Sequence, residues 1–330
     1  MQRRSTFAVL ALASAVSLLC LTSPAAAQPS AKQVLTDFGL SADDVQRVMN
    51  GEFVTNDIPG VNDQDLSIAI AFLVKAAPAD LANQIMAGNL INTDTQVQAS
   101  GKFTTGTVAD LSGLQITSDT AQTLTNASAG ESLNLGANEI TAFNALQGGT
   151  QQAILQQLQQ MLLARYQAYK TSGLAGITPY ARGGGSTDVA ADLRKASQAA
   201  KGLQKYLPGF QQVLLGFPQA TVPGMQQNFL WLNYNIDGAT TFVLTHTLAA
   251  TDGAARAVVQ RQYYVSTGYN AEQAVAGFLP VQEGTVVAYT NHTFTDQVAG
   301  FGGSLKRSIG RRMMATKLKA MFDTARGQVH

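Results

Sequence analysis

Residues 228–248 read NFLWLNYNIDGATTFVLTHTL, and they decide the fold class. Aromatic and β-branched residues, which favour strands, lie on both sides of the dipeptide Asp237-Gly238. Asp-Gly favours two-residue hairpin turns because both central positions need positive φ. The segment therefore predicts two antiparallel strands, over residues 228–236 and 240–248.

Similar turn signals recur toward the C-terminus. Asp252-Gly253 precedes a predicted strand over residues 257–267, and Glu283-Gly284 precedes another over residues 285–293. A short helix or loop is expected over residues 271–279. Strands joined by such turns form an antiparallel meander.

A long helix is predicted after the last strand, over residues 304–326, with a length of roughly 35 Å. Its first apolar stripe repeats every four residues, and a second stripe lies about half a turn away. We therefore expect a bend near Gly310 or two apolar faces. The two stripes are Phe301, Leu305, Ile309 and Met313, then Met314, Leu318, Met321 and Phe322.

The N-terminal part predicts two short helices, over residues 31–38 and 41–50, followed by a strand over residues 65–75. That strand alternates large apolar side chains on one face with Ser67, Ala69, Ala71 and Leu73 on the other. Pro78 then suits the first turn of a helix that ends near Gly88.

Residues 105–220 predict a mainly helical region. An apolar stripe at helical spacing runs through residues 150–172, opposite a glutamine-rich face. A helix over residues 137–146, a flexible joint over residues 182–186 and a helix over residues 187–206 are also expected. A strand over residues 96–104 precedes this region.

The strand followed by Ala77-Pro78-Ala79-Asp80, the late meander ending in VVAYTN (286–291) and the terminal helix together resemble the START-like (SRPBCC, helix-grip) superfamily. The resemblance covers residues 60–90 and 225–326, under half of the chain. It implies an α+β fold in which a curved antiparallel sheet grips a long C-terminal helix. It also implies a cavity between them for lipids, sterols, polyketides or other apolar molecules.

The long middle departs from that pattern, and we interpret it as an inserted cap. The expected organisation is a signal peptide (1–27), N-terminal helices with the first strands (28–104), a helical insertion (105–220), the meander with the C-terminal helix (221–326) and a tail (327–330).

The N-terminus predicts secretion. Arg3 and Arg4 precede an apolar run, and small residues ending at Ala27 suit signal-peptide cleavage, so a periplasmic or secreted protein is expected. Removing the signal takes two of the 22 basic residues and none of the 21 acidic ones, which leaves a net charge of −1. That balance gives no reason to expect a nucleic-acid partner.

The single cysteine, Cys20, lies inside the predicted signal peptide, which excludes disulfides and cysteine-based zinc sites from the mature chain. Nothing after Ala27 is long and apolar enough to predict a transmembrane segment. No cofactor and no metal are expected. Basic residues of the terminal helix suggest a solvated face or, as the alternative, transient docking onto anionic lipid headgroups.

Polar residues on three predicted strands define the candidate site. His246 shares a strand face with Phe242, Leu244 and Leu248, so it is either a neutral core histidine or a polar group that fixes a ligand or acts as a general base. Simple alternation places Gln262 and Tyr264 on one face of their strand. It also places Tyr289 and Asn291 together on theirs, with His292 on the exposed side.

If those faces meet, His246, Gln262, Tyr264, Tyr289, Asn291 and Trp231 form a ligand-binding set in an apolar cavity. The alternative is that these faces meet water. No Gly-x-Ser-x-Gly, His-Glu-x-x-His or P-loop motif occurs, and no catalytic residue is assigned. The leading hypothesis is a carrier of an apolar small molecule or lipid. The alternatives are a hydrolase or cyclase using His246 with a tyrosine, and an envelope interaction module.

Overall fold

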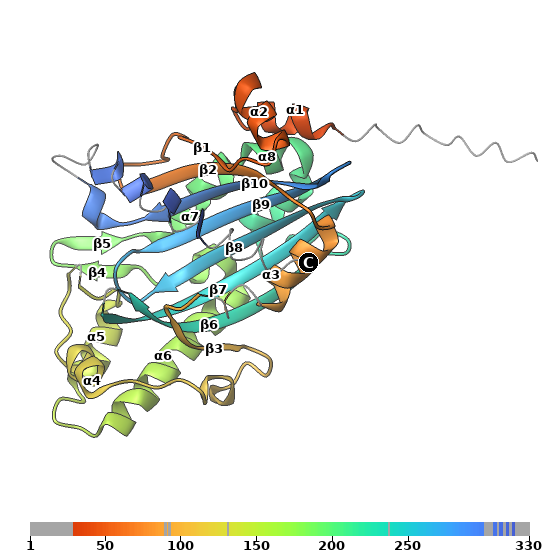
Figure 1. Ribbon diagram of the computed structural model, residues 1–330. Helices are drawn as coiled ribbons and strands as arrows, with labels where there is room; N and C mark the ends of the chain where they lie inside the picture. The colour runs from red at the N-terminus through yellow and green to blue at the C-terminus, as the bar shows by residue number, and fades with distance from the viewer. Residues whose placement is uncertain are drawn as a thin grey trace, which may run out of the picture.

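The computed structural model describes residues 29–88, 91, 94–130, 132–236, 238–299, 306–308, 310–312, 315–316 and 319–320. The predicted signal peptide and most of the predicted closing helix lie outside these residues. The described part has the mixed α+β organisation that the sequence predicts, built around a large antiparallel sheet (Figure 1).

The sheet has eight strands in the order β1-β2-β10-β9-β8-β7-β6-β3, and all neighbours are antiparallel. Its strands are β1 (Val54–Asn56), β2 (Asp65–Val74), β3 (Val97–Lys102), β6 (Gln226–Ile236), β7 (Ala239–Asp252), β8 (Ala255–Val265), β9 (Ala271–Val281) and β10 (Gly284–Phe294). The turn between β6 and β7 forms as predicted because Gly238 takes a φ of 85°.

Two predictions about local structure are wrong. Residues 271–279 form β9, which pairs with β8 and β10 along its length, although alanine, glutamate and glutamine favour helices. Pairing on both edges outweighs that local preference. The expected flexible joint over residues 182–186 instead belongs to a two-stranded hairpin of β4 (Tyr180–Arg182) and β5 (Gly185–Thr187).

Helices cover both faces of the sheet, as Figure 1 shows with α3 in front of the strands and α7 behind them. The helices are α1 (Ala31–Asp37), α2 (Ala42–Met49), α3 (Pro78–Ala87), α4 (Ser118–Thr125), α5 (Ala137–Asn144), α6 (Gln151–Ser172), α7 (Val189–Ala199), α8 (Lys201–Tyr206) and α9 (Pro208–Gly216). We call the side packed against α6 to α9 the helix-covered face, and the side packed against α3 the opposite face.

The hydrophobic core divides between these two faces. On the helix-covered face, Phe242 and Leu244 of β7 pack with the buried stripe of α6, which includes Leu158 and Tyr169. On the opposite face, the large apolar side chains of β2 pack with residues of α3. The period-two pattern of β2 is therefore used as predicted, because each of its faces meets a different layer.

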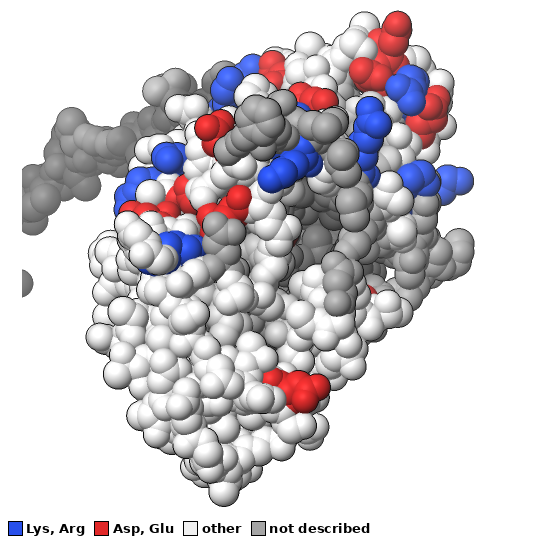
Figure 2. Space-filling view, turned by 90° about the vertical axis from the view of Figure 1, so that its left-hand side faces the viewer, with Lys and Arg blue, Asp and Glu red and all other residues white. Residues whose placement is uncertain are grey.

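The surface is unevenly charged. On the face shown in Figure 2, Lys, Arg, Asp and Glu side chains are concentrated in the upper half, whereas the lower half of that face is almost without them. The lower half carries α4, α5 and most of α6 in Figure 1, and the sequence has no Lys or Arg from residue 103 to 164. Within the described residues, no helix combines the length and apolarity that a membrane span needs.

Candidate functional site

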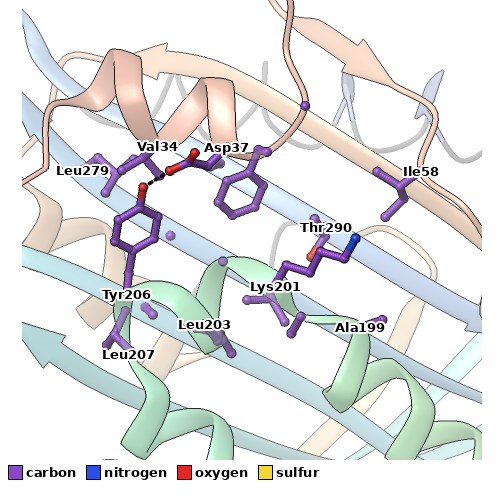
Figure 3. A pocket seen from close by; sticks show the side chains of 18 of the residues that line it. Val34, Asp37, Ile58, Ala199, Lys201, Leu203, Tyr206, Leu207, Leu279 and Thr290 are labelled. Atoms are coloured by element: carbon purple, nitrogen blue, oxygen red, sulfur yellow. Dashed lines mark hydrogen bonds between the residues drawn. The ribbon is translucent and has the colours of Figure 1, made fainter.

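A cavity of about 680 Å³ lies on the helix-covered face, between the sheet and the helices α1 and α8. Figure 3 shows Val34 and Asp37 of α1 on one side of it, and Leu203 and Tyr206 of α8 on the other. Strands β8, β9 and β10 supply its floor. Its walls therefore come from three parts of the chain that are far apart in sequence.

The floor is hollow because it is built from very small side chains. Ala250, Ala257, Gly277, Ala288 and Ala71 are successive cross-strand partners, so they form one row across β7, β8, β9, β10 and β2. The nearest atom to a Cβ added at Gly277 would be the Ala288 carbonyl oxygen, 3.8 Å away. Small side chains in one row leave volume that the helices above do not fill.

A polar clasp joins α1 to α8 at the cavity. The Asp37 carboxylate accepts a hydrogen bond from Tyr206 Oη (Figure 3). It also accepts one from Lys205 Nζ at 2.7 Å. Hydrogen bonds to Lys205 and Tyr206 lower the pKa of Asp37. This clasp links two helices that the sequence separates by more than 160 residues.

His292 lines the cavity and is oriented by a buried carboxylate. Its Nδ1 lies 2.8 Å from Asp65 Oδ2, and the same oxygen accepts a hydrogen bond from the Val61 amide at 2.8 Å. Asp65 is fully buried and His292 is 5% exposed. The expectation that His292 is exposed is therefore wrong: its face was assigned correctly relative to Asn291, but helices cover that face.

A polar row crosses the sheet beside His292. Ser67, His292, Gln273, Arg261 and His246 are successive cross-strand partners on the helix-covered face. Along β10, His292 lies four residues from the small row at Ala288, a distance of ~13 Å. The cavity thus runs from a floor of small side chains to one end of a buried polar row.

Arg261 is the centre of this row. Its guanidinium donates to Gln273 Oε1 at 2.9 Å, to Ser197 Oγ at 2.9 Å and to Tyr169 Oη at 3.1 Å. It also donates to the carbonyl oxygen of Leu214 at 2.9 Å. No carboxylate of the described residues pairs with it, so neutral dipoles hold this buried cation.

His246 belongs to the same row, away from the cavity. It is 0% exposed, and its ring nitrogens lie 3.1 Å from Tyr169 Oη and 2.9 Å from Gln227 Oε1. Burial, and then the positive charge of Arg261, hold the pKa of His246 well below its usual range. These contacts describe a neutral core histidine with both nitrogens hydrogen-bonded, the first of the two interpretations of this residue.

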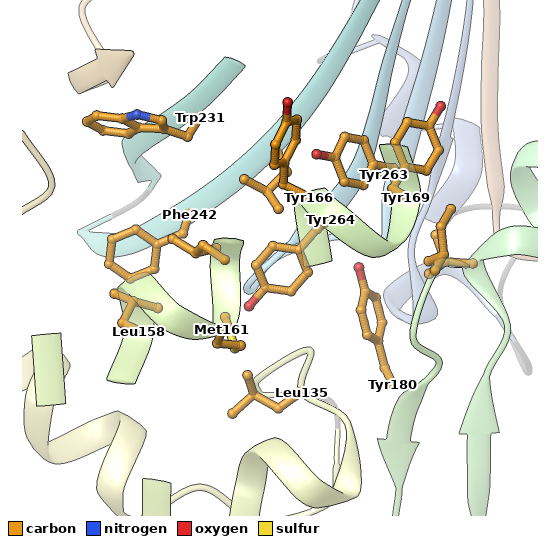
Figure 4. Packing of buried hydrophobic residues seen from close by; sticks show 14 of the residues in the cluster. Leu135, Leu158, Met161, Tyr166, Tyr169, Tyr180, Trp231, Phe242, Tyr263 and Tyr264 are labelled. Carbon is orange, nitrogen blue, oxygen red and sulfur yellow. The ribbon is translucent and has the colours of Figure 1, made fainter. Parts of the chain in front are cut away.

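Trp231 and Tyr264 also lie on the helix-covered face, within the packed aromatic layer under α6 (Figure 4). Trp231 Nε1 donates to the carbonyl oxygen of Asp110 at 2.7 Å, and its ring occupies the space above Gly101. The Arg165 guanidinium lies 4.2 Å from the centre of the Tyr264 ring. Neither aromatic residue lines the cavity.

Gln262, Tyr289 and Asn291 lie on the opposite face, in a buried polar cluster that Glu272 connects, because Glu272 is the cross-strand partner of both Gln262 and Thr293. Asn291 Nδ2 donates to Tyr289 Oη at 3.1 Å, Thr293 Oγ1 donates to Asn291 Oδ1 at 2.7 Å, and Tyr269 Oη donates to Gln262 Oε1. The six predicted residues therefore divide between two faces and do not form one site. The space that the prediction placed between the sheet and the closing helix involves residues outside the described part.

A β-bulge explains the division. Leu244 pairs with Tyr264 but Thr245 pairs with Gln262, which leaves Tyr263 as an extra residue in β8. Tyr263 and Tyr264 both lie on the helix-covered face, and Tyr263 stacks on Tyr169 with ring centres 4.0 Å apart. Strict alternation cannot anticipate the bulge, so it placed Gln262 and Tyr264 together.

The residues that line the cavity are less easily recognised from the sequence than the six predicted site residues. Ser67, Ala69 and Ala71 stand out as a face of small residues, and that face is the one turned to the helices and the cavity side. These residues are recognisable as part of a cross-strand row of small side chains only together with Gly277. The strand that holds Gly277 was expected to be a helix or loop. Without β9, the row of small residues cannot be assembled from sequence.

The chemistry that the site can perform is narrow. Asp65 and His292 have the arrangement of an orienting carboxylate and a base, but no described hydroxyl or thiol group bonds to His292 Nε2. The nearby Ser67 hydroxyl donates to the carbonyl oxygen of Ile58 at 2.9 Å. No group of three or more His, Cys, Asp or Glu residues suited to a metal ion occurs in the described part of the chain.

Comparisons with known proteins add little. No protein-family model and no curated protein sequence matches the chain. Among solved structures, the crystal structure of Ara h 8.0201 is similar at 12% identity and a TM-score of 0.22, with 42% of this chain and 87% of that chain covered. At that TM-score the likeness identifies neither a family nor a ligand.

Proposed function

We propose that this protein binds and carries an apolar small molecule or lipid in the cavity between α1, α8 and strands β8 to β10. The observation that carries the proposal is the hollow floor of Ala257, Gly277 and Ala288 beneath about 680 Å³ of space. That volume falls within the 300–1,000 Å³ typical of small-molecule pockets.

The lining supports an apolar ligand with one polar end. Val34, Phe38, Leu203, Val275 and Leu279 present apolar side chains to the cavity. Thr290 and His292 add polar groups on one strand. The lining also includes Asp37, Asp57, Lys201, Asp252 and Arg256. The cavity therefore combines apolar walls with polar and charged groups, a composition that suits an amphipathic molecule.

A carrier is favoured over a hydrolase or cyclase that uses His246. Both nitrogens of that ring are hydrogen-bonded within the core, and the residue does not line the cavity. The predicted signal peptide supports a role in the periplasm or outside the cell, where apolar molecules need a protein to cross water.

The test is to purify the protein without denaturant, extract it with organic solvent and identify the extract by mass spectrometry. We expect one class of apolar compound at close to one molecule per chain. A protein of similar size, purified from the same host, provides the control extract. An empty extract, together with no binding to a panel of lipids and sterols, would contradict the proposal.

A further inference from the structure

The part of the cavity wall that His292 forms presents a hydrogen-bond acceptor. Because Asp65 is a carboxylate, which only accepts, His292 Nδ1 must carry the proton of the 2.8 Å bond between them. In the neutral ring, Nε2 then has a free lone pair. No described residue donates to that nitrogen, and His292 is part of the cavity wall.

A hydrogen-bond donor lies beside it. Gln273 Oε1 accepts hydrogen bonds from Arg261 Nε at 3.0 Å and from Arg261 Nη2 at 2.9 Å, which fixes the orientation of the amide. The Gln273 Nε2 group is therefore directed away from the guanidinium. It is buried, and it has no hydrogen-bond partner among the described residues.

These two groups are close to each other. Gln273 and His292 are direct cross-strand partners of β9 and β10, on the same face of the sheet. Side chains in that relation have Cβ atoms ~4.5–5.5 Å apart, so a ligand oxygen bound at His292 lies beside Gln273, although Gln273 does not itself line the cavity. An acceptor and a donor side by side are complementary to a group that donates and accepts at once.

This inference rests on the proposed carrier function: we infer that the ligand is an apolar alcohol, with its hydroxyl group at the Gln273–His292 pair. The ligand O–H donates to His292 Nε2, and its oxygen accepts from Gln273 Nε2. An ether offers only an acceptor, and an alkane offers neither. A carboxylate would bring a second negative charge toward the Asp65–His292 pair.

The experiment compares 1-dodecanol, dodecyl methyl ether and dodecane as competitors of a fluorescent apolar dye bound to the full-length protein. We expect 1-dodecanol to bind about tenfold more tightly than the ether, the effect of one well-placed hydrogen bond. Dodecane should bind no more tightly than the ether. Equal affinities for all three would overturn the inference and leave the carrier function standing. If none of the three bound, the proposed function itself would fail.

His292→Phe keeps a ring but removes the acceptor, so the preference for 1-dodecanol should disappear while the ether still binds. Thr293→Val is the matched control, because it removes a hydroxyl from the same strand on the opposite face of the sheet, outside the cavity lining, and leaves His292 intact. The control should keep the preference. A His292→Phe protein that still preferred the alcohol would contradict the inference.

His292→Phe also leaves Asp65 without its imidazole partner and so risks misfolding. A measurement on the unmodified protein avoids this risk. In ¹H–¹⁵N spectra of the histidine rings, the Nε2 resonance of His292 should move on addition of 1-dodecanol and stay in place with the ether. The His246 resonances serve as an internal control, since that ring lies away from the cavity. An unmoved His292 resonance in saturating 1-dodecanol would also overturn the inference.

Discussion

Asp192 shows how single residues of the helical layer respond to their surroundings. It is 5% exposed, and its Oδ1 accepts a hydrogen bond from Asn62 Nδ2 at 2.7 Å. Burial favours the neutral carboxyl group and raises its pKa from 3.8 to about 6, against the opposing effect of Lys195. The folded protein therefore binds this proton more tightly than the unfolded chain.

We predict that this carboxyl group makes the protein less stable as pH rises. Its contribution to the free energy of unfolding is fully present below pH ~4 and is lost as pH rises through about 6. The loss has an upper limit of about 3 kcal/mol. Asp192→Asn should remove this dependence while the amide oxygen still accepts from Asn62. Urea unfolding between pH 4 and pH 7 measures both proteins, and equal pH slopes would contradict the assignment.

For single residues, the sequence predicts which face of a strand a side chain lies on, but it does not predict which element covers that face. His246 shares its face with Phe242 and Leu244, as alternation predicts, but only the packing of α6 shows that its ring is enclosed. His292 was placed on the correct side and expected in water. Alternation gives the relative direction of side chains, and the element that covers them comes from elsewhere in the chain.

The helix pair α1 and α8 is the element that we expect to control access to the cavity. Both line it, and the Asp37 clasp is a hydrogen-bonded connection between them. The clasp is exposed, so water competes with its hydrogen bonds and it adds little to the free energy of unfolding. We therefore expect it to affect the rate of ligand release more than the stability of the fold.

We predict that Asp37→Ala speeds release of a bound apolar dye several-fold, with little change in unfolding temperature. Stopped-flow dilution measures the release rate. Asp43→Ala, at the exposed start of α2, is the matched control and should release the dye at the unmodified rate. In the unmodified protein, release should also quicken as pH falls below 3.8, because the lowered pKa of Asp37 keeps the clasp charged above that pH. An unchanged rate of dye release in Asp37→Ala would contradict a role for the clasp in ligand release.

Elements with a clear local signal were predictable. Turn glycines locate the β6–β7 hairpin, and the apolar stripe of residues 150–172 locates α6. β9 was missed because its helix-favouring composition is outweighed by hydrogen bonds to two neighbouring strands. The predicted closing helix lies mostly outside the described residues, so its grip on the sheet stays a prediction.

At the scale of the whole molecule, the sheet has two differently used faces. The helix-covered face carries the cavity, the small row and the polar row, whereas the opposite face carries the cluster of Gln262, Tyr289 and Asn291. Composition and strand order predicted an α+β protein with a large antiparallel sheet. They could not predict this cavity, because it needs α1, α8 and β9 to meet in space.

The most direct test of the account is to fill the cavity from its floor. Gly277 lies in β9 beneath the open space, so Gly277→Leu should place a side chain where the ligand lies. Gly184→Leu is the matched control, since a Cβ there meets no atom within 4 Å and the residue does not line the cavity. Equilibrium titration with the apolar dye should give at least tenfold weaker binding for Gly277→Leu, and unchanged binding for the control. Full affinity in a folded Gly277→Leu protein would contradict the claim that this cavity holds the ligand.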